Sequence, residues 1–320
     1  MPHSKMPSNI LLFKNTAERL GLTFTKVPIT NSRNLFKIAS AERFYLGSFK
    51  APGFYPETCR WHGVFTGNKR LTQDILQELG YSTIASIFLT PQEHPSFATF
   101  LALAEETYQK FPIILKPNDG MDGRGIKYIA NIKSLKRELK AFYKQGKTVL
   151  LQPIVTEPEY RILIINGSVE LFHSKDFRSI VGDGKNNIKT LLAEILDKNK
   201  NEDFIKLQYT LTGYTKKTVL SEGELFKYHI VKDSSGRHYQ FKKFPKDLMK
   251  WSKSLVKDLS IKTVAIDLFI DGDIEDSSNY IIIELNSNPG LTQYFKACND
   301  SIQPERICEK VLRDYFNLKK

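Results

Sequence analysis

Two strongly apolar runs late in the sequence carry acidic side chains, and this combination constrains the fold more than any other feature. The first run is residues 263–270, with Asp267 inside it, and the second is residues 280–290, with Glu284 and Asn286 inside it. Strands so rich in Ile, Val and Phe bury both faces, and an ionised carboxylate on such a face is costly unless something pairs with it. The pattern therefore predicts a charged partner for these carboxylates, and a metal ion is the partner we expect.

The polar stretch between the two runs, residues 271–279, predicts a hairpin. Pairing of residue 270 with residue 281 places Asp267 opposite Glu284, and Asn286 shares the face of Glu284 because side chains alternate along a strand. Three oxygen ligands then converge with no Cys or His nearby, a set that suits Mg2+ completed by substrate phosphates. The alternative is that Asp267 and Glu284 end their strands and are solvated there.

Size and charge narrow the class of protein. With 320 residues, of which 41% are hydrophobic, the chain can bury the core of roughly two or three domains. Its 47 basic and 35 acidic residues give a net charge of +12, which suits a nucleotide or an acidic substrate. Nucleic acid is the rival ligand, but the basic residues are scattered. The local cluster at residues 133–147 has helical spacing and is predicted to be a solvated helix face.

The cysteines and the hydropathy of the chain indicate the cellular compartment we expect for the protein. The three cysteines, Cys59, Cys298 and Cys308, are odd in number and widely separated. They fit neither a disulfide framework nor a thiolate metal site, and they indicate a reducing cytoplasm. No apolar run approaches the roughly 18 residues of a membrane helix, so we expect neither a signal peptide nor a membrane span.

Hydrophobic periodicity and turn residues predict a mixture of helices and strands. Helices are expected at residues 10–20, 71–79, 97–111, 132–143, 188–197 and 304–316, and further strands at 22–27, 113–116, 126–129, 149–152, 160–165 and 169–173. The stretch from Phe36 to Phe65 is predicted to be irregular because Gly47, Pro52, Gly53 and Pro56 interrupt it. The alternating elements at 98–150 predict a small lid, followed by a longer α+β region.

A candidate phosphate site follows the strand at 113–116. Lys116 ends this apolar strand, and a lysine there offers its charge at reduced dielectric. The next loop, residues 118–125, contains Gly120, Asp122, Gly123, Arg124 and Gly125. Its glycines let backbone amides approach phosphate oxygens closely. The spacing is neither G-x-G-x-x-G nor the P-loop, so an ordinary hairpin turn is an equal alternative.

Residues 149–165 supply the context for that loop. The strand at 149–152 breaks at Pro153, so the carbonyl of Gln152 and the N–H of Ile154 can face an adenine edge. Glu159 can accept hydrogen bonds from ribose hydroxyls, while Arg161 can point at a phosphate or an acyl phosphate.

The chain carries, in this order, strand-Lys-Pro with a glycine loop, Gln-Pro-Ile, Glu-x-Arg, Asp and Glu-x-Asn-x-x-Pro-Gly. This order of motifs resembles the ATP-grasp superfamily of carboxylate–amine ligases. The stretch 178–191, with its Gly182-Asp-Gly184 turn, is similar to the cyanophycin synthetase type of ATP-grasp domain, and the whole match spans residues 66–295. The resemblance implies an α+β (mixed α/β) ATP-grasp fold. It places an N-terminal pre-ATP-grasp region at 1–66, a central lid subdomain at 67–152, and a larger C-terminal antiparallel-sheet subdomain with the magnesium site at 153–320.

The resemblance also implies roles for individual residues. Phosphates of ATP are contacted by Lys69 and Lys116 under the glycine loop, and adenosine is held by Gln152, Ile154 and Glu159. Magnesium is bound by Asp267, Glu284 and Asn286. The transferred phosphoryl group and the substrate acid are stabilised by Arg161 and Arg178. Two simpler alternatives stay open: Lys69 is a solvated lysine at a helix start, and Arg178 belongs to a hairpin corner.

The expected function is that of an ATP-dependent ligase that forms an amide or peptide bond through an acyl phosphate. ATP and Mg2+ are the implied cofactors, and small-molecule or peptide carboxylates and amines are the implied partners, with no nucleic acid or membrane and with a homodimer left open. We expect neither the additional amino-terminal domain nor the second ligase domain of cyanophycin synthetases. Lys227 stands at the position where that branch tends to have an Arg, and the Asn that follows in that branch is missing from this sequence. The identity of the substrate therefore cannot be carried over from that branch. A kinase that phosphorylates a hydroxyl is the alternative within the superfamily.

Overall fold

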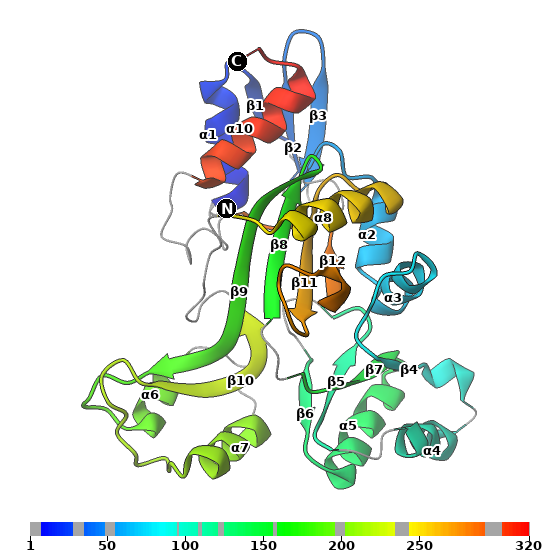
Figure 1. Ribbon diagram of the computed structural model, residues 1–320, viewed down its shortest axis with the longest axis vertical. Helices are drawn as coiled ribbons and strands as arrows, with labels where there is room; N and C mark the ends of the chain where they lie inside the picture. Colours follow the sequence, from blue (N-terminus) through cyan, green and yellow to red (C-terminus); the bar gives the residue numbers. More distant parts are fainter. Residues whose placement is uncertain are drawn as a thin grey trace. The chain divides into compact units, whose positions relative to one another are not determined.

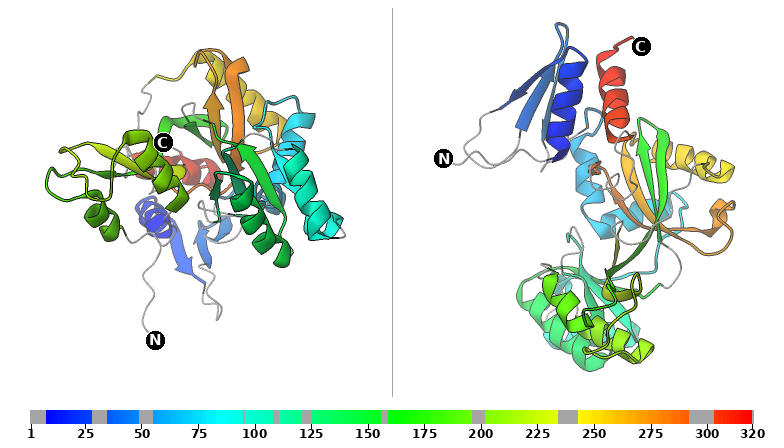
Figure 2. Two further views of the ribbon diagram at one scale, coloured as in Figure 1. Left: turned by 90° about the horizontal axis from the view of Figure 1, so that it is seen from below. Right: turned by 90° about the vertical axis from the view of Figure 1, so that its left-hand side faces the viewer.

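The computed structural model describes residues 8–27, 35–48, 55–94, 96–107, 111–120, 125–155, 159–195, 202–233, 243–291 and 303–319. The chain forms two compact units. Unit 1 contains Met1–Thr83, Pro158–Ser174 and His238–Lys320, and unit 2 contains Ile84–Glu157 and Lys175–Arg237. Figures 1 and 2 show the helices and strands of both units.

The first part of unit 1 is a three-stranded antiparallel sheet with two helices. Its strands are β1 (Thr23–Lys26), β2 (Leu35–Ala39) and β3 (Phe44–Ser48), paired in the order β1-β2-β3. Helices α1 (Ser8–Arg19) and α10 (Gln303–Phe316) lie side by side in both figures although they are far apart in the sequence. Their apolar faces share one core with the sheet, formed by residues such as Phe13, Phe36, Ile38, Ile307 and Leu312.

The prediction of an irregular stretch from Phe36 to Phe65 is wrong. This stretch contains nearly all of the hairpin β2–β3 and also helix α2 (Arg60–Thr66). Gly47 marks a close packing contact inside β3 and not a turn, since a Cβ at this position would overlap the ring of Phe36 and the hydroxyl oxygen of Tyr45. Strand glycines of this kind are easily mistaken for turn signals. The predicted loop residues Pro52 and Gly53 lie outside the described residues.

The second part of unit 1 is a larger antiparallel sheet that is buried on both faces. It contains β8 (Glu159–Ile165), β11 (Val264–Ile270), β12 (Tyr280–Asn286) and the first part of β9 (Ser168–Val181), in the order β9-β8-β11-β12. One face contributes Leu163 and Ala265 to the core under α1 and α10. The other face packs against α2, α3 (Lys69–Glu78) and α8 (Lys246–Asp258) through side chains that include Ile164 and Ile266. Burial on both faces explains the continuous apolar runs in the sequence.

Unit 2 begins with a four-stranded antiparallel sheet. Its strands are β4 (Ile87–Leu89), β7 (Val149–Pro153), β5 (Ile113–Pro117) and β6 (Lys127–Ile129), in the order β4-β7-β5-β6. Helices α4 (Phe97–Thr107) and α5 (Ile132–Lys144) form a core with it that includes Phe100, Leu115 and Leu139. Lys133, Lys136 and Lys140 are exposed on α5, so the basic cluster is the predicted solvated helix face.

The rest of unit 2 is built on the second part of β9, which pairs with β10 (Leu225–Asp233). Unit 2 also contains the helices α6 (Ile188–Glu194) and α7 (Glu202–Thr212) and the 3-10 turn η1 (Pro91–Glu93). The 3-10 turn η2 (Ser277–Asn279) belongs to unit 1. An apolar cluster joins Ile114 and Tyr128 of the four-stranded sheet to Phe204 of α7, Ile230 of β10 and Phe177 of β9.

The predicted division at residues 66 and 152 stays a prediction. Within the described part of the chain, no helix combines the length and the apolar character needed to cross a membrane.

Candidate active site

Three charged side chains of unit 1 lie in one row across three neighbouring strands. Asp267 of β11 is the register partner of Arg161 on β8 and of Glu284 on β12. Asn286 follows on β12, opposite Ala265 of β11. Directly opposite residues in antiparallel strands share a face, so the fold places the predicted Asp267 and Glu284 side by side. We call Arg161, Asp267 and Glu284 the acidic row.

A β-bulge produces this alignment. The hairpin begins with Ile270 opposite Tyr280 and continues to Leu268 opposite Ile282, but Asp267 then pairs with Glu284. Ile283 is the extra residue, and a regular ladder would have set it opposite Asp267. The predicted hairpin and the predicted pairing of Asp267 with Glu284 are both confirmed, although the pairing at residue 270 is one residue away from the expected register.

Asp267 already has a partner within the protein. Its side chain is buried, with 2% of the residue exposed, and both carboxylate oxygens accept hydrogen bonds from the Arg161 guanidinium. The Arg161 Nη2 to Asp267 Oδ2 distance is 2.5 Å. A bidentate arginine pair of this kind offsets the cost of burying the carboxylate. We expected Arg161 to face a phosphate, and no sequence pattern predicted its pairing with Asp267.

The donor set fits Mg2+ by its chemistry. Two carboxylates and one amide oxygen are hard ligands, and a carboxylate offers about four lone-pair sites, of which the Arg161 fork uses two. Asn286 Oδ1 accepts a hydrogen bond from the N–H of Asn288 at 2.9 Å, which fixes its orientation. No cluster of three or more His, Cys, Asp or Glu side chains suited to a metal occurs among the described residues. Water or phosphate oxygens would have to complete the coordination.

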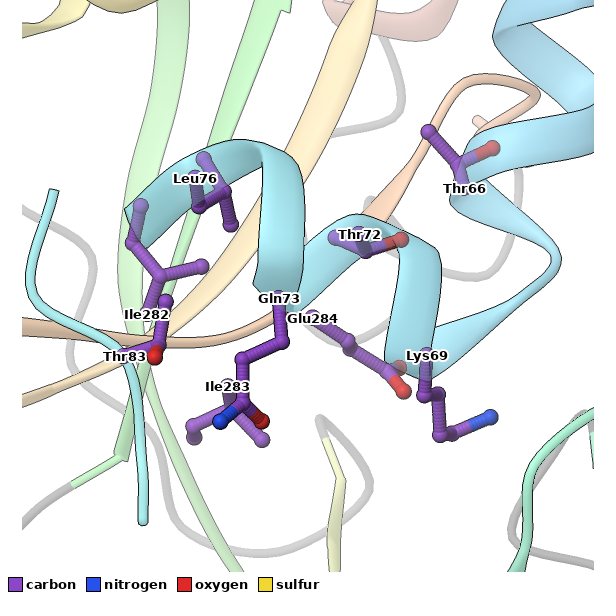
Figure 3. A pocket seen from close by; sticks show the side chains of 9 residues that line it. All are labelled: Thr66, Lys69, Thr72, Gln73, Leu76, Thr83, Ile282, Ile283 and Glu284. Carbon is purple, nitrogen blue, oxygen red and sulfur yellow. The ribbon is translucent and has the colours of Figure 1, made fainter. Parts of the chain in front are cut away.

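Lys69 lies beside the acidic row. It is the first residue of α3, whose N-cap Asn68 accepts a hydrogen bond from the N–H of Leu71 at 3.0 Å. A small pocket between α3 and β12 is lined by Thr66, Lys69, Thr72, Gln73, Leu76, Thr83, Ile282, Ile283 and Glu284. Figure 3 shows that its charged members, Lys69 and Glu284, come from these two elements. The helix start thus brings a cation to the rim that Glu284 also lines.

Polar residues from the first part of the chain hold the loop that follows Asn286. The Tyr55 hydroxyl donates to the carbonyl of Pro289 at 2.5 Å, and Asn9 Oδ1 accepts from the N–H of Leu291 at 2.9 Å. Thr66 Oγ1 lies 2.9 Å from Ser287 Oγ. No chemistry was predicted for this early region. Its contribution is to fix the backbone next to the predicted metal ligands, and no local motif announces such long-range bonds.

In unit 2, the predicted nucleotide residues lie on the four-stranded sheet and its ends. Lys116 is on β5 and only 6% exposed, and Gln152 is 3% exposed on the adjacent β7. The Gln152 Nε2 donates to Ser86 Oγ at 2.7 Å. Ile154 packs onto the cluster of Tyr128, Phe204 and Ile230.

The glycine loop joins β5 and β6, which are antiparallel neighbours. Gly125 has a φ of +79°, a conformation that favours glycine, and Gly120 also lies in the described part of the loop. The predicted site residues Asp122, Gly123 and Arg124 lie outside the described residues. A hairpin connection and a phosphate cradle are both compatible with this arrangement, so its role stays a prediction.

The remaining predicted residues are divided between the units. Glu159 begins β8 opposite Phe269 in unit 1, and Arg178 lies on β9 opposite His229 in unit 2. Unit 1 therefore contains Lys69, Glu159, Arg161, Asp267, Glu284 and Asn286, whereas unit 2 contains Lys116, Gly120, Gly125, Gln152, Ile154 and Arg178.

The turn near Arg178 has a structural role for its acidic residue. Asp183 Oδ1 accepts from the backbone N–H of Asn186 at 2.7 Å and of Lys185 at 2.9 Å. These two hydrogen bonds lower the pKa of the partly exposed Asp183 carboxyl, and the bond from Asn186 has the larger effect. Asp183 thus stabilises its own turn.

Comparisons with known proteins identify relatives. No family model matches the chain. The glutathione biosynthesis bifunctional protein GshAB of Desulfotalea psychrophila is 26% identical over 251 residues, which cover 70% of this chain and 31% of that protein. The cyanophycin synthetase of Geminocystis herdmanii is 26% identical over 145 residues, or 40% of this chain and 17% of that protein. The chain spans less than a third of the length of these curated relatives.

Among solved structures, a bifunctional glutathione synthetase from Pasteurella multocida has a TM-score of 0.51 at 15% identity, covering 95% of this chain and 44% of that chain. This likeness confirms the expected fold class, a mixed α/β ATP-grasp fold with antiparallel sheets. The relatives confirm the expected resemblance to ATP-grasp carboxylate–amine ligases, including the cyanophycin synthetase branch.

Proposed function

We propose that this protein is an ATP-dependent carboxylate–amine ligase that forms an amide or peptide bond. The acidic row carries the proposal, because it sets a buried carboxylate between an arginine and a second carboxylate on strands of an ATP-grasp fold. The similarity to a glutathione biosynthesis protein and to a cyanophycin synthetase supports it. The proposed partners are a small or peptide acid and an amine, in the cytoplasm.

The proposed reaction has two transfers. An oxygen of the substrate carboxylate attacks the γ-phosphorus of ATP, the bond from that phosphorus to the β,γ-bridging oxygen breaks, and ADP leaves. The amine nitrogen then attacks the acyl carbon, phosphate leaves with the electrons of the acyl C–O bond, and the nitrogen loses a proton. Such chemistry depends on positioning and charge neutralisation more than on a protein nucleophile.

Residues of unit 1 would hold the metal end of the nucleotide. Asp267, Glu284 and Asn286 would bind Mg2+, whose chemical contribution is to neutralise charge on the phosphates. Arg161 keeps the Asp267 carboxylate in a fixed orientation through its two hydrogen bonds. Lys69, on the rim shared with Glu284, would contact a phosphate.

Residues of unit 2 would hold the rest of the nucleotide. Lys116 has a largely buried position, so its attraction to a phosphate is screened less than that of a surface lysine. The hydrogen bond from Gln152 to Ser86 ties down the end of β7, next to the backbone groups of Gln152 and Ile154 that would face adenine. Arg178 would contact the substrate acid.

Two substitutions test this proposal. We expect Lys116→Met and Glu284→Gln each to reduce amine-dependent ADP release by at least ~100-fold, because the first removes a cation that would face a phosphate and the second removes a negative charge that would hold Mg2+. A matched control is Lys144→Met, which removes an exposed lysine at the end of α5. Circular dichroism verifies the fold of each variant.

The substrate pair comes from a screen of acids against amines for ADP release, with mass analysis of the product. Near-normal turnover in both variants would overturn the ligase assignment. A stable phosphate ester formed without an amine would show a kinase instead.

A further inference from the structure

One contact between two hydroxyl groups joins two parts of unit 1 that carry different kinds of predicted site residues. Thr66 is the last residue of α2, and its Oγ1 lies 2.9 Å from Oγ of Ser287. Lys69, the first residue of α3, follows Thr66 by three positions, and Asn286 directly precedes Ser287. The contact therefore connects the helix of the proposed phosphate-binding lysine with the strand of the proposed metal ligands.

The hydrogen bonds around this contact have a defined direction. The Thr66 hydroxyl donates its single proton to the carbonyl of His62 at 2.7 Å. The Thr66 oxygen is then the acceptor toward Ser287, so Ser287 Oγ is the donor. Thr58 Oγ1 donates to the carbonyl of Ser287 at 3.4 Å, which holds the same residue through its backbone. Ser287 is only 3% exposed, so little water competes for these bonds.

The corner between α2 and α3 passes the position of Thr66 on to Lys69. Only two residues separate the helices. The buried Thr72 hydroxyl lies 2.5 Å from the carbonyl oxygen of Phe65 and 3.0 Å from that of Asn68, and these contacts tie the end of one helix to the start of the next. Figure 3 shows Thr66, Thr72 and Lys69 at this corner.

The loop side of the contact is fixed as well. Asn286 Oδ1 accepts from the N–H of Asn288 at 2.9 Å. Glu284 lies two residues before Asn286 on β12, so both side chains share a face of the strand. Glu284 also lines the small pocket together with Thr66 and Lys69. A hydrogen bond at the residue after Asn286 thus sets where the oxygen ligands lie relative to the lysine.

We propose that Thr66 and Ser287 are positioning residues for the nucleotide: their hydrogen bond sets Lys69 against Glu284 and Asn286, so that the lysine and Mg2+ bind one triphosphate. This inference rests on the proposed function. Neither hydroxyl has to touch the nucleotide, because each acts through a neighbour on its own element. A displacement of about 1 Å in a site of this kind can reduce the rate by about 100-fold.

Calorimetry on the full chain tests the proposal with the β,γ-imido analogue of ATP, titrated once with Mg2+ and once with EDTA. The ratio of the two affinities is the metal gain. The variants are Thr66→Val, Ser287→Ala and the double variant, and Thr66→Ser is the conservative variant that keeps the hydroxyl. Thr16→Val is the control. Thr16 is a buried threonine of α1, and its Oγ1 has no hydrogen-bond partner among the described residues. Urea denaturation verifies that each variant is folded.

Each single variant is expected to lower the metal gain by at least ~5-fold, the size of effect that one hydrogen bond predicts. The double variant should be within ~2-fold of the single variants, because all of them remove the same bond. Thr66→Ser and Thr16→Val should keep the wild-type gain. If Thr66→Val does not fold, Ser287→Ala decides by itself.

Three results overturn the positioning role. They are a wild-type metal gain in Thr66→Val and Ser287→Ala, a loss in Thr66→Ser as large as that in Thr66→Val, and affinities that fall equally with and without Mg2+. The last result would show a purely structural role, because a positioning role acts on the agreement between lysine and metal.

Failure of the proposed function gives a different result. Wild type without a metal gain refutes the proposed Mg2+ nucleotide site, and the positioning role with it. A stable phosphate ester formed without an amine refutes only the ligase assignment, while a lower metal gain in both single variants still supports the positioning role.

Discussion

The acidic row of unit 1 and the lysine cluster of unit 2, which is Phe177 with Lys227 and Lys232 near its ring, both lie on bulged strands. The charges are of opposite sign in the first region and alike in the second. In each, a bulged antiparallel ladder turns charged side chains toward a common point. The acidic row contains opposite charges, so Arg161 and Asp267 stabilise each other without a ligand. The lysine cluster contains like charges around a ring. The difference teaches that charge removal should damage the fold in the first region and spare it in the second.

The largest expected effect is on Asp267→Ala. This change leaves the Arg161 guanidinium without its carboxylate at a site where only 16% of the arginine side chain is exposed. We expect the free energy of unfolding to fall by about 3–5 kcal/mol, measured by urea denaturation. Replacing both members, Arg161→Met with Asp267→Leu, should recover part of the loss. A change below about 1 kcal/mol in Asp267→Ala would contradict the view that this pair stabilises unit 1.

A smaller effect is expected at the base of the β9–β10 ladder. A Cβ on Gly182 would overlap the carbonyl oxygen of Ser221 and the side chain of Leu220. Gly182→Ala should therefore cost about 1–3 kcal/mol, again by urea denaturation, because the neighbouring backbone has to shift. Val181→Ala is the control, since Val181 is 56% exposed. Equal stability of both variants would mean that the ladder tolerates displacement and positions its lysines loosely.

The loop beside the acidic row gives a third prediction. Tyr55→Phe removes the hydroxyl that donates to the Pro289 carbonyl in a buried position. Stability should fall by about 1 kcal/mol, the usual net value of a hydrogen bond. The rate of ADP release should fall as well, because Pro289 lies in the loop whose Asn288 N–H donates to the side chain of Asn286 at the end of β12. Unchanged stability and turnover would remove Tyr55 from the support of this site.

The smallest effect is expected for Lys227→Met, which removes the exposed lysine over the Phe177 ring. Loss of this charge removes one cation–π contact and also a repulsion, so the free energy of unfolding should change by less than about 1 kcal/mol in low salt. Thermal denaturation at two salt concentrations measures it. Destabilisation as large as that of Asp267→Ala would erase the contrast between the two regions.

The acidic row was largely predictable from the sequence, and the lysine cluster was not. Asp267 and Glu284 are close in sequence, and their apolar surroundings restrict the hairpin register to a few choices. The partner Arg161 lies on a strand far away in the chain, and no local pattern encodes which residue of β8 stands opposite Asp267. The bulges of β10 depend on tertiary packing in the same way. Gly47 shows the opposite error, because this glycine was interpreted as a turn signal although it makes room for the side chains of Phe36 and Tyr45.

The pairing of α1 with α10 has a consequence for how the protein is made. Unit 1 takes its first helix and its last helix from distant parts of the chain, so its core cannot close until the ribosome has delivered nearly everything between them. Unit 2 draws on two internal segments and can be complete earlier. The apolar surface of α1 therefore stays exposed until α10 has been synthesised. We expect chaperones that bind the nascent chain to act chiefly on α1.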